Sequence, residues 1–390
     1  MSPSSVISPV VMIGMWILQP ASWLVILQVA IGLGFAIFVH ELGHFLIARF
    51  NKVDVESFSI GFGKEIFGWN DKSGTRWKIC WIPLGGYVKF FGDRNVFSQA
   101  EQEELLKKYN EEDRKKLFVV KPLYQRSLIV AAGPFANFLL AIVIFAFIYM
   151  VAGKDFTPAQ IQEVQPESPA FVAGIKSGDV IKSINNNEVK SIMEVSAFIN
   201  SSSSKTINIK ILRNDNELDF NVNPKFTKGE DSLGNKINKK IIGIKIAPLN
   251  NEIERQRLGP ATALFYAVKE TWFVIGASWE FVISMFKGTG DTSQLGGPIK
   301  IAKISGQVAK LGFIAFLSIM AYISISLGFI NLFPIPMLDG GHLMFYAFEK
   351  ILGRPLTQRT QEGFFRIGLF LLLSLMFFTT FNDLKDLGLF

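Results

Sequence analysis

Long apolar runs dominate the pattern of hydrophobic and polar positions along this chain. A membrane-spanning helix needs roughly 20 largely apolar residues. Four segments reach that length with at most one Asp, Glu, Lys or Arg each, and they predict transmembrane helices over 21–48, 127–153, 313–338 and 364–382. A shorter apolar run at 6–18 has no Lys or Arg before it, so we interpret it as an interfacial or loop segment rather than a signal-peptide core.

A fifth apolar segment, 258–288, differs from these four. It carries Lys269, Glu270 and Glu280 near its middle, together with two Trp residues. Three charges at mid-span are costly in a bilayer. Trp and charged side chains together are typical of an amphipathic helix at the membrane surface. We therefore expect this segment to lie at the interface.

Lys and Arg set the expected orientation, because cytoplasmic loops carry an excess of both. Residues 1–48 contain neither. The loop after the first helix and the loop after the third are rich in them, at Arg49, Lys52, Arg114, Lys115, Lys116, Lys121 and Arg126, and at Lys350, Arg354 and Arg359. The pattern predicts that both loops are cytoplasmic, whereas the N-terminus, the long polar stretch 154–257 and the C-terminus are outside.

Composition supports a membrane protein. Hydrophobic residues make up 49%, charged residues only 19%, and there are 37 Phe, which excludes disorder, a coiled coil and a disulfide scaffold. The net charge of +7 fits the positive-inside bias of membrane proteins, so nucleic acid is not needed to explain it. The single cysteine, Cys80, excludes an intrachain disulfide and a cysteine-based zinc site.

The first predicted helix contains an HExxH motif formed by His40, Glu41 and His44. Histidines four residues apart lie on one helix face, where both rings can bind one Zn²⁺, and the Glu between them can take a proton from water at the metal. HExxH also occurs by chance in unrelated helices. In a membrane-spanning helix, however, three such polar side chains are expensive and need a partner that satisfies them together.

A catalytic zinc uses three protein ligands and keeps a fourth position open. The third ligand must come from elsewhere, and the stretch 331–342 offers two candidates, Asp339 and His342. Two prolines in this stretch break or kink the third helix, and irregular backbone at membrane depth is tolerated where it lines a cavity. An ordinary helix end, in which Asp forms a cap and Gly a turn, would show the same sequence pattern without any metal.

At these residues the sequence resembles the site-2 protease family of intramembrane zinc metalloproteases, and it looks most like the RseP branch. The family pairs HExxH in its first core helix with N-x-x-P-x-P-x-L-D-G in a later one, and this chain has both at those spacings. The resemblance implies Glu41 as general base and three zinc ligands: His40, His44 and Asp339. It also implies substrate contacts by Asn331, Pro334 and Pro336. His342 matches no family ligand.

The resemblance extends to other segments. Residues 157–225 are similar to PDZ domains of bacterial proteases, as one unit where the RseP branch often has two. Strand-like segments with Gly-rich turns between the first two helices predict hairpins, and the resemblance implies a sheet that dips into the membrane near the zinc. Its edge could pair with an unwound substrate. Two further motifs, 133–137 and 296–298, also look like family motifs, and small residues at helix contacts explain them without a special role.

The expected fold class is an α-helical polytopic membrane protein. It has a four-helix transmembrane core, a membrane-associated β-hairpin region and an inserted extracytoplasmic PDZ domain of the α+β class. The expected parts are an N-terminal segment, the first half of the core, the PDZ domain, a linker, interfacial helices and the second half of the core, at 1–20, 21–153, 154–228, 229–257, 258–312 and 313–390.

The expected function is zinc-dependent hydrolysis of peptide bonds within transmembrane segments of single-pass membrane proteins, after a first protease has trimmed them. By resemblance, the substrates are anti-sigma factors or remnant signal peptides, and the enzyme lies in a bacterial inner membrane with its metal site toward the cytoplasm. The PDZ domain would contact the substrate ectodomain or C-terminus, and no nucleic acid is expected. Two alternatives are a non-catalytic PDZ-bearing membrane scaffold and another HExxH membrane hydrolase, such as a prenyl-protein protease.

Overall fold

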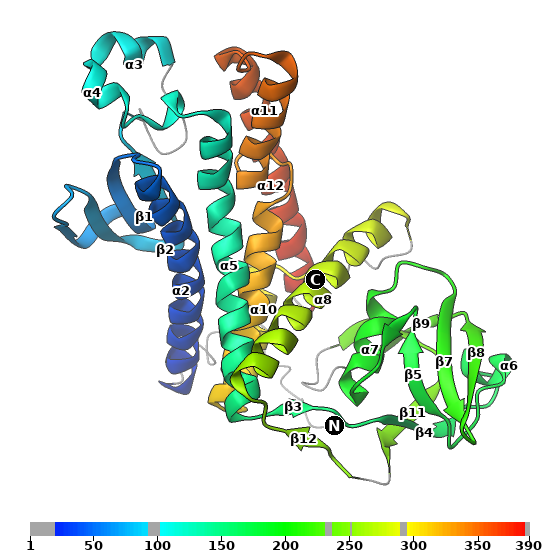
Figure 1. Ribbon diagram of the computed structural model, residues 1–390. Coiled ribbons are helices and arrows are strands. Elements are labelled where there is room, and N and C mark those ends of the chain that lie inside the picture. The colour runs from blue at the N-terminus through cyan, green and yellow to red at the C-terminus, as the bar shows by residue number, and fades with distance from the viewer. Residues whose placement is uncertain (1–19, 93–101, 231–235, 250–251, 289–294, 387–390) are drawn as a thin grey trace, which may run out of the picture. The chain divides into compact units, whose positions relative to one another are not determined.

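The computed structural model describes residues 20–92, 102–230, 236–249, 252–288 and 295–386 (Figure 1). The chain divides into two units. The first comprises residues 1–143 and 308–378, and the second comprises 144–307 and 379–390. The segment 6–18, expected at the interface, lies outside the described residues.

Four long helices match the four predicted spans. They are α2 (Pro20–Phe50), α5 (Leu123–Val151), α10 (Phe313–Asn331) and α12 (Gln358–Asp386). Among the described helices, these four are long and apolar enough to cross a membrane. At a rise of 1.5 Å per residue even the shortest, α10, is about 28 Å long, which approaches the hydrocarbon thickness of a bilayer. Four helices long and apolar enough to cross a membrane are thus present in the described part of the chain, and the number that forms the transmembrane core stays a prediction.

Helices α2, α5 and α10 pack closely because glycines stand at their contacts. A Cβ on Gly43 of α2 would lie 2.8 Å from Cβ of Ala136 on α5, and one on Gly328 of α10 would lie 2.8 Å from the Pro134 carbonyl oxygen. Only residues without a side chain allow backbones to approach this far. The consequence is that the HExxH face of α2 is held directly against α5.

The third predicted span ends earlier than expected. Helix α10 stops at Asn331, an irregular turn covers 332–338, and a new helix, α11 (Asp339–Leu352), begins at the aspartate. Pro334 and Pro336 lack a backbone N–H and cannot continue the helix. Asp339 is therefore the first residue of a new helix, not the end of the third span.

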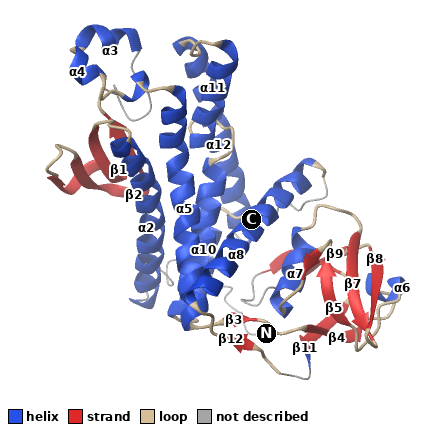
Figure 2. Cartoon of the chain, in the orientation of Figure 1, coloured by secondary structure: helices blue, strands red, loops and turns tan. Residues whose placement is uncertain are grey.

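The predicted hairpin after the first helix is present as β1 (Val55–Asn70) and β2 (Arg76–Phe90), shown in Figure 2. The strands curl, so that residues 57–60 pair with 86–89 on one side and with 76–79 on the other. Phe58 and neighbouring apolar side chains pack this sheet against α2. Two short helices, α3 (Gln102–Lys108) and α4 (Glu111–Arg114), and a 3₁₀ turn, η1 (Phe118–Val120), lead to α5.

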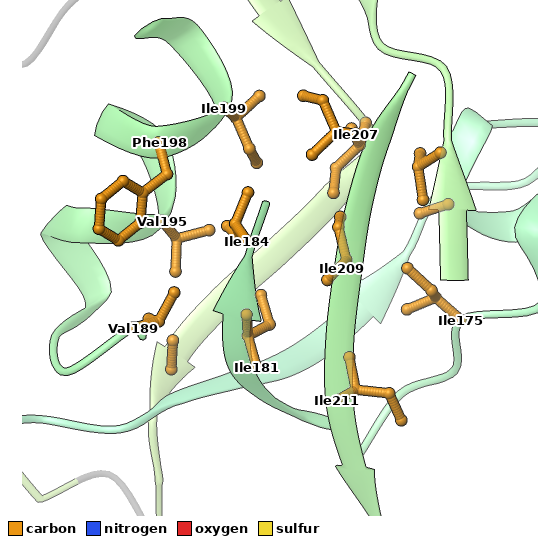
Figure 3. Close-up of a cluster of buried hydrophobic side chains, with 14 of the residues drawn as sticks. Ile175, Ile181, Ile184, Val189, Val195, Phe198, Ile199, Ile207, Ile209 and Ile211 are labelled. Atoms are coloured by element: carbon orange, nitrogen blue, oxygen red, sulfur yellow. The ribbon is translucent and has the colours of Figure 1, made fainter. Parts of the chain in front are cut away.

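The second unit contains a mixed domain built on a six-stranded sheet of order β11-β4-β5-β7-β8, with β6 paired to β5. Its strands are β4 (Ala159–Val164), β5 (Val180–Ile184), β6 (Asn187–Glu188), β7 (Ile207–Arg213), β8 (Asn216–Val222) and β11 (Ile244–Pro248). Helices α6 (Pro169–Ala173) and α7 (Ile192–Ser201) accompany it. Alternate Ile residues of β7 and the inner face of α7 form its core (Figure 3).

The segment expected to be a linker, 229–257, differs from that expectation. The hairpin of β9 (Lys225–Glu230) and β10 (Lys236–Ile241) enters it, and β11 follows and pairs with β4 inside the main sheet. The domain therefore extends to Pro248. A further short pair, β3 (Lys154–Asp155) with β12 (Arg255–Gln256), joins its two ends.

Helices α8 (Pro260–Phe286) and α9 (Pro298–Ala309) follow in the second unit. Helix α8 is not one of the four candidate spans. Trp272 and Trp279 are exposed on it, whereas Glu270 lies 3.4 Å from Nζ of Lys154 and accepts a hydrogen bond from Tyr149. One of the three charges that made a membrane span costly, Glu270, is thus paired within this unit. Its place at a membrane surface stays a prediction.

Candidate metal centre

Three side chains of the first unit converge on one point. His40 and His44 lie one turn apart on α2, and Asp339 begins α11. Nε2 of His40 is 3.1 Å from Oδ2 of Asp339 and 3.3 Å from Nε2 of His44. Nε2 of His44 is 3.5 Å from Oδ1 of Asp339. Ligand atoms of all three lie within 4.8 Å of one another.

This donor set fits a zinc ion. Two imidazole nitrogens and a carboxylate oxygen are ligands that zinc accepts. The Nδ1 atom of His44 lies 2.8 Å from the carbonyl oxygen of Ile129 and donates its proton there, which leaves the Nε2 lone pair facing the cluster. Oδ2 of Asp339 is buried and has no hydrogen-bond partner among the described residues. The imidazole lone pairs and the carboxylate oxygens converge without a hydrogen-bond donor between them, and a cation bound there would satisfy them.

The backbone leaves space for such an ion. Gly133 of α5 faces the two histidines, and a Cβ there would lie 2.9 Å from Nε2 of His40 and closer still to Nε2 of His44. Burial raises the pKa of the Asp339 carboxyl, but the neighbouring His44 and His40 outweigh this and hold the pKa below its usual range.

Glu41 lies beside the cluster and is buried. It borders a cavity of about 470 Å³ that is lined from α2, β2, α10, α11 and α12. Gly86 of β2 lies directly against it, since a Cβ on this glycine would be 3.0 Å from Cγ of Glu41. The hairpin strand 86–89 therefore forms one wall of the cavity next to this carboxylate.

The structure distinguishes the two candidates for the third ligand. Asp339 belongs to the cluster, whereas His342, one turn further along α11, lines the same cavity outside it. Burial lowers the pKa of the His342 imidazole, which favours its neutral form. Its ring lies 5.7 Å from the ring of Phe365, centroid to centroid, so it packs against the fourth long helix.

The three predicted substrate contacts are placed differently from one another. Asn331 ends α10 and lines the cavity, with Nδ2 donating to the Leu327 carbonyl oxygen at 3.0 Å. Pro334 and Pro336 lie in the turn 332–338 and are not among the residues that line it. Both prolines shape the backbone turn that places Asp339 at the start of α11.

A model of "Peptidase family M50" matches residues 28–375. The chain belongs to peptidase family M50. Its relatives include "Putative zinc metalloprotease mll0638" of Mesorhizobium japonicum, which is 41% identical over 351 residues, or 89% of this chain and 95% of that protein. "Metalloprotease MmpA" of Caulobacter vibrioides is 35% identical over 373 residues, covering 90% and 93%.

These matches confirm the resemblance to site-2 proteases, and with it a zinc metalloprotease of this family in a membrane protein. The PDZ domain of an SdrC-like protein from Listeria monocytogenes is 23% identical, with a TM-score of 0.19, over 23% of this chain and 88% of that one. At this TM-score the likeness to PDZ domains stays a prediction.

Sequence reasoning passed over two residues that approach the cluster from α5. Gly133 and Asn137 belong to the segment 133–137, which looks like a family motif and which small residues at helix contacts explain without a special role. The motif in which they occur, four residues apart, was the available signal, but it did not show which helix they would face.

Proposed function

We propose that this zinc metalloprotease hydrolyses peptide bonds inside the transmembrane segments of single-pass membrane proteins. The observation that carries the proposal is the position of the cluster: two of its three ligands and Glu41 lie on α2, a helix long and apolar enough to span a membrane. A protease that cleaves soluble substrates does not need its metal centre on a helix of this kind. Polar groups inside a membrane helix mark a functional site by default.

In this proposal His40, His44 and Asp339 hold the zinc, which supplies a Lewis acid for the scissile carbonyl and a water of lowered pKa. The Glu41 carboxylate takes the proton from the attacking water and delivers it to the leaving amine nitrogen. Glu41 is buried and lines the same cavity as the three ligands, which places it beside the position of the attacking water.

The hairpin supports a way to present the substrate. Residues 86–89 pair with 57–60 on one side, and no other strand in the described part of the chain pairs with their opposite side. A helix hides its carbonyl groups, so a membrane substrate must unwind before attack, and an extended segment can add to a free strand edge. Asn331, on the cavity wall, would contact the same segment.

Other surfaces of the hairpin fit contact with lipid. Large apolar side chains are exposed on it, at Ile66, Phe67, Trp69, Trp81 and Ile82. From the family resemblance we propose that the enzyme lies in a bacterial inner membrane, and from the Lys and Arg pattern that the hairpin and the metal cluster face the cytoplasm. Residues 154–248 would form a periplasmic PDZ domain that contacts the substrate ectodomain or C-terminus, and the substrate would already have been trimmed by a first protease.

The experiment compares the wild type with Glu41→Gln, Asp339→Ala and His342→Ala in detergent. Bound zinc and cleavage of a single-pass model substrate are measured together. The proposal expects about one zinc per wild-type chain, metal without activity in Glu41→Gln, loss of metal in Asp339→Ala and retained metal in His342→Ala. A Glu41→Gln variant that cleaves as well as the wild type contradicts the proposal and favours another reaction centre. Cleavage confined to a prenylated peptide would favour the other HExxH hydrolase.

A further inference from the structure

Asn137 occupies a position that the function described so far does not use. It lies on α5, fully buried, with its amide Nδ2 only 3.1 Å from Nδ1 of His40. Its amide oxygen Oδ1 is buried and has no hydrogen-bond partner in the described part of the protein. An unpaired buried amide oxygen inside a helix bundle costs free energy, so it needs an explanation.

The chemistry of His40 supplies one. Its Nε2 faces Asp339 and His44 at 3.1 and 3.3 Å, so Nε2 is the atom directed at the metal position. An imidazole that offers Nε2 as a ligand carries its proton on Nδ1. Nδ1 is then a donor and requires an acceptor, which an NH₂ group cannot be.

A half-turn of the Asn137 amide about its Cβ–Cγ bond resolves both difficulties. It places Oδ1 where it can accept the proton of His40 Nδ1, and the oxygen is no longer without a partner. We infer that Asn137 is a positioning residue for the metal ligand His40, and that its amide oxygen fixes the ring with Nε2 toward the zinc. The inference rests on the metal site proposed above.

The second histidine is held in the same manner by the same helix. Nδ1 of His44 lies 2.8 Å from the carbonyl oxygen of Ile129. Ile129, Gly133 and Asn137 follow one another at intervals of four along α5, so they lie on one face of that helix. This face, which we call the α5 wall, orients His44 with a backbone carbonyl, makes room for both rings at Gly133, and orients His40 with an amide.

The wall is itself held in register with its neighbours. The backbone oxygen of Asn137 accepts a hydrogen bond from Oγ of Ser324 on α10 at 2.9 Å. Gly328, one turn further along α10, lets that helix approach until an added Cβ would lie 3.2 Å from Cβ of Asn137. The Asn137 side chain is thus fixed from behind, as a residue that orients a metal ligand must be.

A purely structural role for Asn137 makes a different prediction. If the side chain only fills space between helices, an apolar residue of the same shape should serve as well. If it orients His40, an acceptor must be present at that point whatever its charge. Asn137→Leu keeps the shape and removes the acceptor, whereas Asn137→Asp keeps an acceptor oxygen for His40 Nδ1.

The test measures metal affinity in the purified full chain, without reference to activity. Zinc is titrated against a competing chelator, and the visible spectrum of the cobalt-substituted protein reports the ligand geometry. We expect the zinc affinity of Asn137→Leu to fall about 10- to 100-fold, as is usual when the group behind a histidine ligand is lost. Asn137→Asp should stay near the wild-type affinity and keep the wild-type cobalt spectrum.

Controls separate this outcome from misfolding and from failure of the proposed function. Ser318→Ala removes a hydroxyl on α10 that donates within its own helix, to the Ile314 carbonyl oxygen at 3.0 Å, so it should keep the wild-type zinc affinity. If Asn137→Leu does not fold, Asn137→Ala replaces it in the same titration. Equal zinc affinity in wild type and Asn137→Leu, or an Asn137→Asp as weak as the leucine variant, overturns the inference but not the metal site. A wild type that binds no zinc overturns both.

Discussion

Replacing Gly133 by alanine tests the geometry of the metal centre with a single methyl group. The added Cβ would stand 2.6 Å from Cε1 of His44 and 2.9 Å from Nε2 of His40, where ordinary contacts begin at 3.4 Å. Because the Cβ is fixed to the backbone of α5, the rings must move by about 0.5 Å or more to restore van der Waals separation. Zinc–ligand distances tolerate only about 0.2 Å.

We therefore expect Gly133→Ala to lower zinc affinity by more than about 100-fold, beyond the usual effect of losing a group behind one ligand. Chelator competition measures the affinity, and thermal unfolding of the metal-free proteins shows whether the fold survives. Gly34→Ala on α2 is the matched control, because a Cβ there meets no atom within 4 Å. A folded Gly133→Ala protein with wild-type zinc affinity would refute the placement of the ligands.

Three further predictions concern buried charges of the second unit, each measured by hydrogen exchange of the full chain. Lys154→Met removes a half-buried cation that contacts Glu194 and Glu270 at 3.6 and 3.4 Å, and it should destabilise α8 by about 2 kcal/mol, which is roughly 30-fold faster exchange. Arg213→Met removes the cation that lies 2.7 Å from the Asp179 carboxylate, which is only 1% exposed. The stability of β5 and β7 should fall by about 3 kcal/mol, and Arg213→Lys should restore only part of it. The Asp383 carboxylate accepts hydrogen bonds from three backbone N–H groups at the start of α9, so Asp383→Ala, which removes this cap, should cost about 1 kcal/mol there. Unchanged exchange in any of these variants contradicts the corresponding contact.

The sequence predicts well those features that depend only on the spacing of residues close together along the chain. A run of apolar residues as long as a bilayer is thick predicts a helix able to span it, so the four long apolar helices were predictable. Two histidines four residues apart share a face of any helix, so His40 and His44 were predictable as a pair. Neither inference depends on how distant segments meet.

The features that the sequence predicts poorly depend on contacts between segments that lie far apart along the chain. Asp339 and His342 are both chemically suitable ligands, and only the turn at 332–338 decides which one reaches α2. Asn137 acts through a ring 97 positions earlier in the chain. Strand β11 was taken for linker because its partner, β4, lies some 80 residues before it along the chain. Pairing over such distances leaves no periodic trace in the sequence.

The cavity at the metal centre contains every histidine of the chain, since the sequence has 3 and His40, His44 and His342 all line it. Protein labelled with nitrogen-15 only at histidine would therefore give a magnetic resonance spectrum of this cavity and of nothing else. Three pairs of ring nitrogens would report directly which atoms carry protons and which face an ion, in a membrane protein too large for complete assignment. The scarcity of histidine makes the intact enzyme its own probe.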